Sequence, residues 1–366
     1  MISRLFHLKK FWKNKKVFLT GHTGFKGSWL SIFLHLLGAK VSGYSLKANK
    51  ISLFNLSNLS KVMSESTVGD IRDYKKLKKT IKNFAPDFLI HMAAQPLVRY
   101  SYDFPKYTYE VNTLGTINIL NILNELEFIK SALIITTDKV YKNINQKRHF
   151  KEEDRLGGFD PYSNSKACAE LICDSYYNSF LAKKKISCVT ARAGNVIGGG
   201  DFALNRIIPD FFRSLKNKKL ALRYPNAIRP WQHVVEPLYG YILLLMRIGE
   251  KKNLVQGDAW NFGPKKSNNI KVKDVVSILN NEFDNPIQIV EESHNQPNYK
   301  KESNMLMLNS FKSKKFLKWK PIYSLSKSIK LIAEWQKAHM LKKKNMFIVT
   351  QKQIEDYLNS TSHNDR

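Results

Sequence analysis

The sequence predicts an α/β protein with a doubly wound parallel sheet and a smaller, mostly helical C-terminal lobe. Three observations support this fold class. A glycine-rich turn separates the first apolar run from a helix-period stretch, strand-length apolar runs alternate with helical stretches up to Arg192, and the pattern becomes irregular from Ala193. We expect a sheet domain over residues 1–192, to which segments near 230–262 return, and a lobe with C-terminal helices over residues 193–366.

The first strand, turn and helix lie between Val17 and Leu37. An apolar run ends at three glycines spaced by three residues, and an apolar helical face follows. Glycine lets the backbone turn sharply and approach a diphosphate, whose charge the N–H groups of a helix N-terminus stabilise. We predict a dinucleotide site here, with a plain tight turn as the alternative. The candidate cofactor contacts are Gly21, Thr23, Gly24, Phe25, Lys26 and Gly27.

The second and third strands would hold the adenosine half of a dinucleotide. The second strand is predicted over Lys40–Ser45, and it ends without the acidic residue that commonly binds the ribose hydroxyls. These residues therefore leave NAD and NADP open. A third short strand ends at Asp70, and a helix is predicted from Ile71 to about Phe84. Asp70 can accept a hydrogen bond from an adenine amino group or cap that helix, and Asp70 and Ile71 are both candidate cofactor contacts.

Further strands end at the edge of the sheet where open α/β folds build their sites. The fourth strand is predicted over residues 86–91, and small residues that suit close contact with a cofactor follow it. A long helix is expected over residues 107–125, the fifth strand over 131–137 and the sixth over 185–192. The candidate cofactor contacts in this part of the chain are Ala93, Ala94, Gln95 and Asn112.

Tyr162 and Lys166 open the helix between the fifth and sixth strands, and their spacing of four places them on one helical face. A tyrosine phenol titrates near pH 10 and is a poor base at neutral pH. A nearby ammonium group and an oxidised nicotinamide favour the phenolate, so we expect a lowered pKa at Tyr162. Tyr162 is then a general base for an alcohol, Lys166 holds the nicotinamide ribose as a cofactor contact, and Thr137 hydrogen-bonds the same alcohol oxygen.

Asp138 and Lys139 follow Thr137 and add an acid and a base to this group. Oxidation of an alcohol to a ketone acidifies the neighbouring C–H, so that a further hydroxyl can leave as water. Such an elimination needs an acid for the leaving oxygen and a base for the carbon-bound proton. Asp138, with a raised pKa, is the candidate acid, and Lys139 is the candidate base if burial lowers its pKa. A surface ion pair at the end of a strand is the alternative.

The predicted lobe contains a glycine-rich loop over residues 194–201 that suits substrate binding. Its helices are expected over residues 206–216, 236–249, 272–281 and 325–342, and a further lysine-rich helix ends the chain.

Composition predicts a cytoplasmic protein, and its charge is compatible with an anionic nucleotide substrate without deciding for one. The 366 residues carry a net charge of +30, but the lysines are spread over many helices, so solvated faces are a better reading than RNA or membrane binding. The basic N-terminus reads as a short lead-in, and no apolar stretch reaches the roughly 20 residues of a membrane span. Without paired spacing, the cysteines predict free thiols and no metal site. They are Cys168, Cys173 and Cys188.

These residues resemble the extended short-chain dehydrogenase/reductase family and, more narrowly, the CDP-glucose 4,6-dehydratases. The lysine at position 139 carries most weight, because the related dTDP-glucose dehydratases have glutamate there. The motifs that match are spread over the chain at residues 21–29, 91–99, 137–141, 191–201, 229–233 and 260–264.

The resemblance implies a Rossmann-type domain, tightly held NAD, CDP-glucose as substrate and a homodimer paired through helices that include the one bearing Tyr162. It also implies that Tyr162 removes the sugar 4-hydroxyl proton as C4 is oxidised, that water is lost across C5 and C6 with Asp138 as acid, and that hydride returns to C6. The product, CDP-4-dehydro-6-deoxyglucose, would serve deoxysugar and O-antigen synthesis. The implied substrate contacts are Arg99, Arg192, Asn195, Arg206 and Arg229.

Two alternatives stay open at this point. A 4-epimerase, or a dehydratase for another nucleotide sugar, shares the oxidation step but not the role of Asp138 or the cytosine preference. A non-catalytic NAD-sensing or RNA-binding protein is supported by the net charge alone, and the joint presence of Thr137, Tyr162 and Lys166 argues against it.

Overall fold

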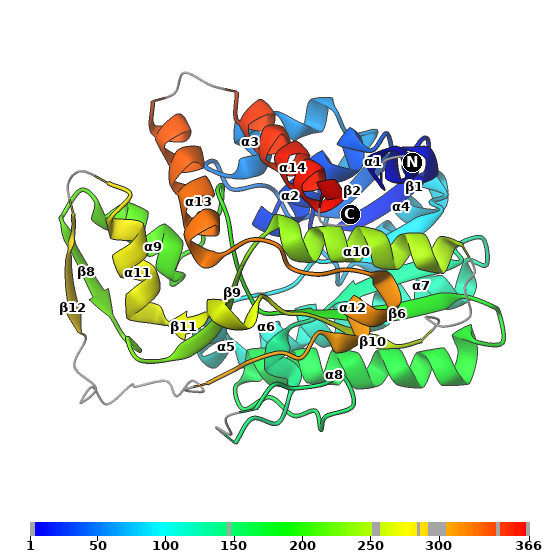
Figure 1. Ribbon diagram of the computed structural model, residues 1–366. Coiled ribbons are helices and arrows are strands. Elements are labelled where there is room, and N and C mark those ends of the chain that lie inside the picture. Colours follow the sequence, from blue (N-terminus) through cyan, green and yellow to red (C-terminus); the bar gives the residue numbers. More distant parts are fainter. Residues whose placement is uncertain are drawn as a thin grey trace.

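The centre of the protein is a sheet of seven parallel strands. The structure is a computed structural model that describes residues 4–144, 148–250, 257–283, 286–291, 305–341 and 345–363. The strand order β10-β6-β5-β4-β1-β2-β3 grows in both directions from β1, which confirms the predicted doubly wound fold (Figure 1). The strands are β1 (Lys16–Thr20), β2 (Lys40–Ser45), β3 (Glu65–Val68), β4 (Phe88–His91), β5 (Ser131–Ile135), β6 (Ser187–Ala193) and β10 (Ala259–Phe262).

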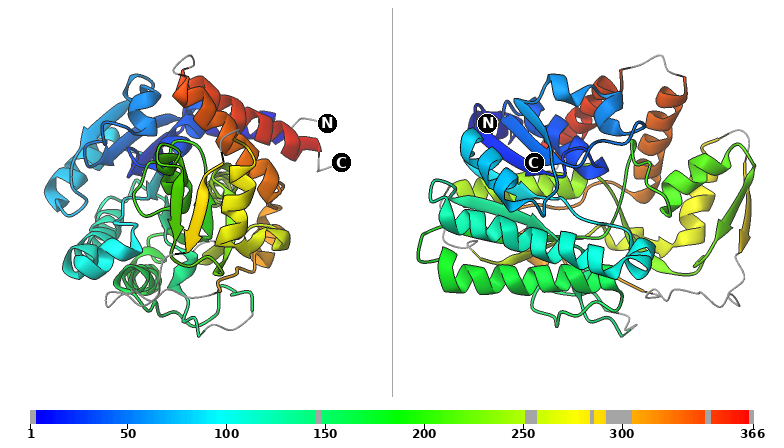
Figure 2. Two further views of the ribbon diagram at one scale, coloured as in Figure 1. Left: turned by 90° about the vertical axis from the view of Figure 1, so that its left-hand side faces the viewer. Right: turned by 180° about the vertical axis from the view of Figure 1, so that it is seen from behind.

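Helices cover both faces of this sheet. Two clusters of buried apolar side chains, one on each face, bury the inner strands of the sheet, whereas the edge strand β3 is largely exposed. One face carries α2 (Phe25–Leu36), α10 (Val235–Gly249), α12 (Phe311–Leu317) and α14 (Met346–His363). The other carries α4 (Tyr74–Phe84), α7 (Gly115–Glu125) and α8 (Pro161–Tyr176), and Figure 2 shows these layers from two further sides.

A smaller lobe stands at one end of the sheet, on the left in Figure 1. A third cluster of buried apolar side chains lies in this lobe and joins its helices to a parallel pair of short strands. A three-stranded sheet of order β11-β9-β7 connects the lobe to the main sheet domain. The elements are β7 (Asn195–Ile197), α9 (Ile207–Ser214), β8 (Lys219–Leu222), β9 (Ile228–His233), β11 (Asn269–Lys271), α11 (Val272–Asn280), β12 (Gln288–Glu291) and α13 (Leu325–Met340).

Two segments differ from the sequence prediction. The long helix expected over residues 107–125 is divided into α6 (Pro105–Tyr109), a π-helical turn η2 (Glu110–Leu114) and α7. The N-terminal lead-in forms α1 (Arg4–Trp12), whose Leu8 and Trp12 are buried. The indole of Trp12 packs against the Phe88 ring at 5.0 Å between centroids. Six basic residues in the first sixteen conceal this narrow apolar side, which is why composition alone predicts a lead-in.

Other expectations concern the cysteines and the membrane. All three cysteines are free, as predicted, and Cys173 and Cys188 are buried between α8 and β6. In the described part of the chain, no helix combines the length and apolar character that crossing a membrane requires. The short elements that complete the main domain are α3 (Leu53–Leu56), η1 (Leu59–Lys61), α5 (Val98–Asp103), η3 (Asp138–Val140), η4 (Tyr177–Leu181) and, nearer the lobe, η6 (Lys266–Asn268).

Candidate active site

The catalytic candidates meet at the carboxyl end of β5. Thr137 follows this strand, and Asp138 begins the 3-10 turn η3. Tyr162 lies in the first turn of α8, which Asp160 caps by accepting a hydrogen bond from the backbone N–H three residues further on, at 2.9 Å. The hydroxyl of Tyr162 is hydrogen-bonded to Thr137. The structure therefore brings together two residues that are 25 positions apart in the sequence, as the motif spacing predicts.

The Tyr162 phenol is buried, and this decides its acidity. Burial raises the pKa of Tyr162 to about 12, although the hydrogen bond with Thr137 and the charge of Arg206 act to lower it. The lowered pKa expected from the sequence is therefore wrong for the protein chain by itself, because desolvation outweighs the cations that the chain supplies. A phenolate at this position requires further positive charge, and an oxidised nicotinamide carries such a charge.

Lys166 holds the end of β5 directly. Its ammonium group donates a hydrogen bond to the carbonyl oxygen of Ile135 at 3.0 Å, and its side chain is buried. Burial lowers the pKa of Lys166 to about 8, and the nearby charge of Lys26 lowers it further. An ammonium group has three donors, so two remain for the hydroxyls of a ribose.

Asp138 has the acidity that its predicted role needs. Burial raises the pKa of Asp138 to about 6, against the opposing charges of Lys139, Arg229 and Lys26 and a hydrogen bond from Thr137. One carboxyl oxygen accepts that bond at 3.1 Å, and the other has no hydrogen-bond partner among the described residues. The raised pKa predicted from the sequence is confirmed. A carboxyl group that keeps its proton up to about pH 6 can donate it to a leaving oxygen.

The glycine-rich turn has the shape of a phosphate cradle. Gly21 adopts a φ of +78°, and a Cβ there would meet the backbone nitrogen of Ala93 at 2.8 Å. A Cβ at Gly27 would meet the carbonyl oxygen of Gly21 at 2.1 Å, so this helix position must also be glycine. Gly24 has an ordinary backbone conformation and precedes α2, which begins at Phe25. The first N–H groups of α2 therefore face a turn into which a diphosphate fits.

The predicted adenosine contacts are engaged within the protein. Thr23 shares a hydrogen bond of 2.8 Å with Ser45 at the end of β2. The carboxylate of Asp70 binds the backbone and guanidinium of Arg72, and these bonds hold the pKa of Asp70 below its ordinary value. Asp73, not Asp70, caps α4, so the capping role considered for Asp70 is wrong. Ile71 packs in the core beneath Gly115, and its backbone carbonyl oxygen accepts a hydrogen bond from Asn118 at 3.0 Å.

The loop after β4 is fixed by the other predicted cofactor residues. Asn112 accepts a hydrogen bond from the Gln95 backbone N–H at 2.8 Å and donates to the Gln95 carbonyl oxygen at 3.1 Å. Its amide also donates to Ser165 on α8 at 2.9 Å. The backbone N–H of Ala93 is held by Thr20 at 3.1 Å, and the half-buried Ala94 follows it. These contacts shape the wall of the cleft beside the glycine turn.

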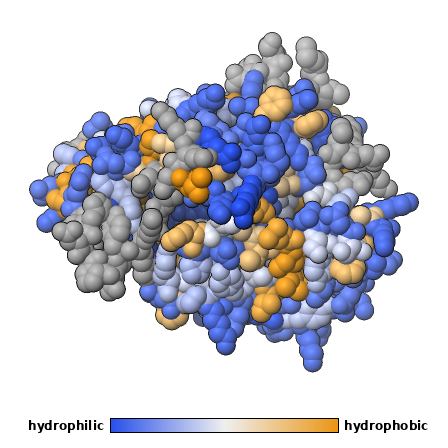
Figure 3. Space-filling model, turned by 90° about the horizontal axis from the view of Figure 1, so that it is seen from below, coloured by the Kyte–Doolittle hydropathy of each residue, from blue (hydrophilic) through white to orange (hydrophobic). Residues whose placement is uncertain are grey.

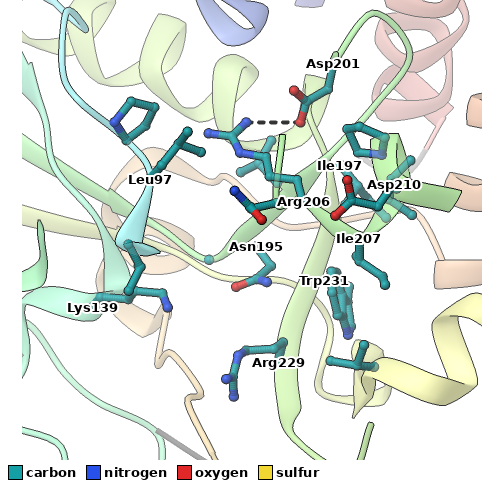
Figure 4. A pocket seen from close by; sticks show the side chains of 18 of the residues that line it. Leu97, Lys139, Asn195, Ile197, Asp201, Arg206, Ile207, Asp210, Arg229 and Trp231 are labelled. Carbon is teal, nitrogen blue, oxygen red and sulfur yellow. Dashed lines mark hydrogen bonds and ion pairs between the residues drawn. The ribbon is translucent and has the colours of Figure 1, made fainter. Parts of the chain in front are cut away.

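A cavity of about 310 Å³ lies between the catalytic candidates and the lobe. Thr137, Asp138, Lys139 and Tyr162 line one side of it. In Figure 4, the side chains of Lys139, Asn195, Arg206 and Arg229 surround the same opening, and Arg206 is paired with Asp201 at 3.0 Å. The volume and the cations suit a sugar joined to a diphosphate. The predicted substrate contacts that line the cavity are Arg99, Asn195, Arg206 and Arg229.

Arg192 is placed differently from these four residues. It is 3% exposed, and its guanidinium forms a bidentate pair with the carboxylate of Glu170, at 2.9 and 2.8 Å. A further donor reaches the Tyr141 hydroxyl at 2.8 Å. Arg192 therefore lies on β6, beside β5, which we call the catalytic strand because Thr137 and Asp138 follow it. It is not among the residues that line the cavity.

Sequence reasoning missed several parts of this cavity. Lys26 was assigned to the cofactor turn, but it also lines the cavity, and burial with the charge of Arg206 lowers its pKa to about 8. A lysine at a helix N-terminus, where the dipole disfavours cations, was the available signal. The side of the cavity formed by β8 and the residues after it offers no comparable signal in the sequence, because its pattern is that of an ordinary strand with alternating buried and exposed residues. The missed lining residues include Asn205, Leu220, Leu222, Arg223 and Tyr224, whereas Asp201 and Trp231 belong to the loop over residues 194–201 and the motif over 229–233 that the sequence singles out.

The residues present fit a nicotinamide dinucleotide. Gly21 and Gly27 leave space that a Cβ would fill, α2 offers free N–H groups at the same point, and Lys166 and Tyr162 stand at the end of the cleft. Within the described residues, no cluster of three or more His, Cys, Asp or Glu side chains could hold a metal ion. Fold and site together define a dinucleotide-dependent enzyme of the short-chain dehydrogenase/reductase class.

Comparison with known proteins narrows this class. The family model described as GDP-mannose 4,6 dehydratase matches residues 18–332. The chain is 41% identical over 361 residues to a CDP-glucose 4,6-dehydratase of Salmonella typhimurium, covering 97% of this chain and 99% of that protein. It is 24% identical to the human dTDP-D-glucose 4,6-dehydratase, covering 91% and 93% of the two chains. The chain belongs to the GDP-mannose 4,6-dehydratase family, which comprises NAD-dependent nucleotide-sugar dehydratases, and it is a hydro-lyase of that family.

Solved structures show the same fold at low sequence identity. The dTDP-glucose 4,6-dehydratase of Bacillus anthracis, in complex with NAD, superposes with a TM-score of 0.74 at 21% identity, covering 89% of this chain and 98% of that one. The UDP-glucose 4-epimerase of Thermotoga maritima gives a TM-score of 0.75 at 18% identity, with 89% and 99% of the two chains covered. These structures confirm the predicted fold. The predicted dehydratase family is confirmed by the family model and by the relative with 41% identity.

Proposed function

We propose that this protein catalyses the 4,6-dehydration of CDP-glucose to CDP-4-dehydro-6-deoxyglucose. The observation that carries the proposal is the cavity in which a buried acid, Asp138, and the cation of Lys139 stand beside Tyr162. An epimerase needs the oxidation site but not a carboxyl group with a raised pKa. The relative with 41% identity bears the name of this activity, which supports cytidine as the base.

The residues divide the reaction between them. Bound NAD supplies an acceptor for the hydride of C4 and a donor for its return at C6. Tyr162 takes the proton of the 4-hydroxyl group, and Thr137 hydrogen-bonds the same oxygen. Lys166 holds the nicotinamide ribose and keeps the end of β5 in place. Asp138 gives its proton to the 6-hydroxyl group as water leaves, and Lys139, after losing its own proton, is the base at C5 in this proposal.

The substrate diphosphate occupies the side of the cavity that faces the lobe. Arg206 and Arg229 supply the guanidinium groups there, with Asn195 between them (Figure 4), and Arg99 also lines the cavity. Arg192 has no part in this contact, because Glu170 and Tyr141 already engage its donors. Lys26 adds a cation in the first turn of α2, close enough to Arg206 that the guanidinium charge helps to lower the pKa of Lys26.

The experiment that tests this function compares four nucleotide sugars. The purified protein is mixed with NAD and with CDP-, dTDP-, GDP- or UDP-glucose, and each product is analysed by mass. We expect CDP-glucose to lose one water and the other three to react poorly. A product of unchanged mass would indicate epimerisation, and preferential dehydration of another sugar would assign the activity to a different nucleotide.

Replacing Arg206 by leucine should weaken substrate binding more than turnover. A charge-assisted hydrogen bond to phosphate contributes about 1.5–3 kcal/mol, so we expect the Kd for CDP to rise roughly 10- to 100-fold. Isothermal titration calorimetry at two salt concentrations measures this change. The control is Arg247→Leu on α10, since its side chain is exposed to a similar extent, 30% against 32%, and is paired with Glu250 away from the cavity. Equal affinities for CDP in the two variants would remove Arg206 from the diphosphate site.

The quaternary structure and cellular role also belong to this proposal. We infer a homodimer that pairs through α8 and the neighbouring η2. Leu171 on α8 and Leu114 on η2 are 59% and 51% exposed, and Figure 3 shows apolar residues gathered on the lower face of the molecule, where α8 lies in Figure 1. Sedimentation velocity of the purified protein tests the dimer.

The proposed cellular role follows from the product, which is a precursor for deoxysugars of surface polysaccharides such as O-antigen and is made in the cytoplasm.

A further inference from the structure

Three side chains of α8, spaced by four residues, contact consecutive groups at the end of β5. Tyr162 is hydrogen-bonded to Thr137, and Lys166 donates to the Ile135 carbonyl oxygen at 3.0 Å. Glu170 accepts a hydrogen bond from the hydroxyl of Thr136. Residues four apart lie on one helical face, so this face of α8 holds the catalytic strand at three points. The first two points belong to the catalytic group, and the third has no role in the mechanism given above.

The third contact is part of a buried ion pair. The side chains of Glu170 and Arg192 are each 3% exposed, and Thr190 on β6 donates to the same carboxylate at 2.6 Å. Although burial favours the neutral acid, Arg192 and the two threonines hold the pKa of Glu170 below its ordinary value, so it stays charged. Burying two charges costs about as much free energy as their attraction returns. Stability alone is therefore a poor explanation for this pair.

The Glu170–Arg192 pair also contacts the far end of residues 136–141, the loop that carries Thr137 and Asp138. One guanidinium nitrogen of Arg192 donates to the Tyr141 hydroxyl at 2.8 Å and to the Glu152 carbonyl oxygen at 3.0 Å. Tyr141 in turn donates to Asn261 on β10 at 2.7 Å. Thr136 precedes Thr137 and Asp138, and Tyr141 follows η3. The network thus holds the segment that carries the proposed acid on both sides.

We propose that Glu170 and Arg192 are positioning residues, which fix the distance between Tyr162 on α8 and the Thr137–Asp138 segment after β5. The inference rests on the proposed function for its catalytic consequence. The first proton transfer requires Tyr162 and Thr137 at the 4-hydroxyl oxygen of the sugar, and the second requires Asp138 at the 6-hydroxyl oxygen. A displacement of about 1 Å at such a site costs on the order of 10²-fold in rate. Glu170 transmits the constraint from α8 to the strand, and Arg192 transmits it to the loop.

Two threonines that bind the same carboxylate supply a matched test. Thr136→Val removes the bond to the catalytic strand, whereas Thr190→Val removes a bond to β6, and the two side chains are 5% and 4% exposed. We expect kcat for CDP-glucose to fall on the order of 10²-fold in Thr136→Val with KM within about threefold of the parent. Thr190→Val should keep the parental kcat, and Thr136→Ser, which restores the hydroxyl, should recover most of it.

A second measurement does not depend on turnover. Hydrogen exchange, followed by mass spectrometry on peptides from residues 136–141 and 160–166, should be faster in Thr136→Val and unchanged in Thr190→Val. Equal kcat and equal exchange in the two variants would overturn the proposal. If the parent protein dehydrates none of the nucleotide sugars, the proposed function fails, and the exchange result alone decides whether the network positions the loop.

The double variant Glu170→Met with Arg192→Met removes both charges, so no ion is left unpaired in the interior. We expect it to fold with a Tm close to that of the parent and to lose kcat as Thr136→Val does. A folded double variant with the parental kcat would show that the pair has no positioning role.

Discussion

Tyr162→Phe should abolish turnover while leaving the fold and the binding of CDP intact. The phenol is the one group at the 4-hydroxyl that the proposed reaction uses as a base, and a general base contributes about 10² to 10⁴-fold to a rate. We therefore expect kcat to fall on the order of 10³-fold and the absorbance of the nicotinamide to stay that of the oxidised form when CDP-glucose is added. Stopped-flow absorbance and product mass analysis measure both effects.

The matched control for this variant is Tyr241→Phe. Tyr241 is also fully buried, and its hydroxyl has no hydrogen-bond partner among the described residues. It lies close enough to Tyr162 and Asp138 that their charges help to raise its pKa, but it does not line the cavity. Loss of its hydroxyl should leave kcat unchanged. Oxidation of the sugar by Tyr162→Phe at the parental rate would show that another group removes the proton.

Local spacing accounts for the parts of the site that were predictable. Thr137 ends an apolar strand and Tyr162 opens the next helix, and in a parallel sheet both must lie at the same edge. The spacing of four between Tyr162 and Lys166 then fixes their common face. The second strand is predicted with the bounds of β2. The catalytic roles given to these residues stay predictions until the variants are measured.

The remaining features depend on contacts between distant residues. Arg192 ends a strand in a motif that suggests phosphate binding, but its partner Glu170 is on α8, and only the folded chain shows the pair. The phenol of Tyr162 has a raised pKa because the whole fold buries it, which no local pattern reports. Lys26 illustrates the same limit, because its side chain leaves the glycine turn and reaches a cavity shared with the lobe.

Asp138→Asn should separate the two halves of the reaction. The initial oxidation needs Tyr162 and Lys166, which this change leaves in place, so reduced nicotinamide should form when CDP-glucose is added. Loss of water needs a proton donor with a raised pKa at the 6-hydroxyl, and an amide cannot supply that proton. In the parent, dehydration should slow as the pH rises through the Asp138 pKa of about 6, because the carboxyl group then loses its proton. Product mass measured against pH shows both effects.

The same substitution should stabilise the fold at neutral pH. The pKa of Asp138 is raised from 3.8 to about 6 in the folded protein, so the folded state binds this proton more tightly than the unfolded state. The stability from this group is complete below pH 3.8 and is lost as the pH rises to about 6. Two pKa units correspond to about 3 kcal/mol, which Asp138→Asn should recover above pH 6 and not at pH 3.5 or below. Denaturant titrations at several pH values measure the difference.

Glu236→Gln separates the stability effect from the catalytic one. Glu236 on α10 is also buried, and burial raises its pKa to about 7, but it accepts backbone hydrogen bonds from Ile322 and Tyr323 outside the cavity. We expect this variant to gain stability above neutral pH and to dehydrate CDP-glucose as the parent does. If Asp138→Asn also dehydrates at the parental rate, the acid at the 6-hydroxyl is another group, and the raised pKa of Asp138 is a consequence of burial alone.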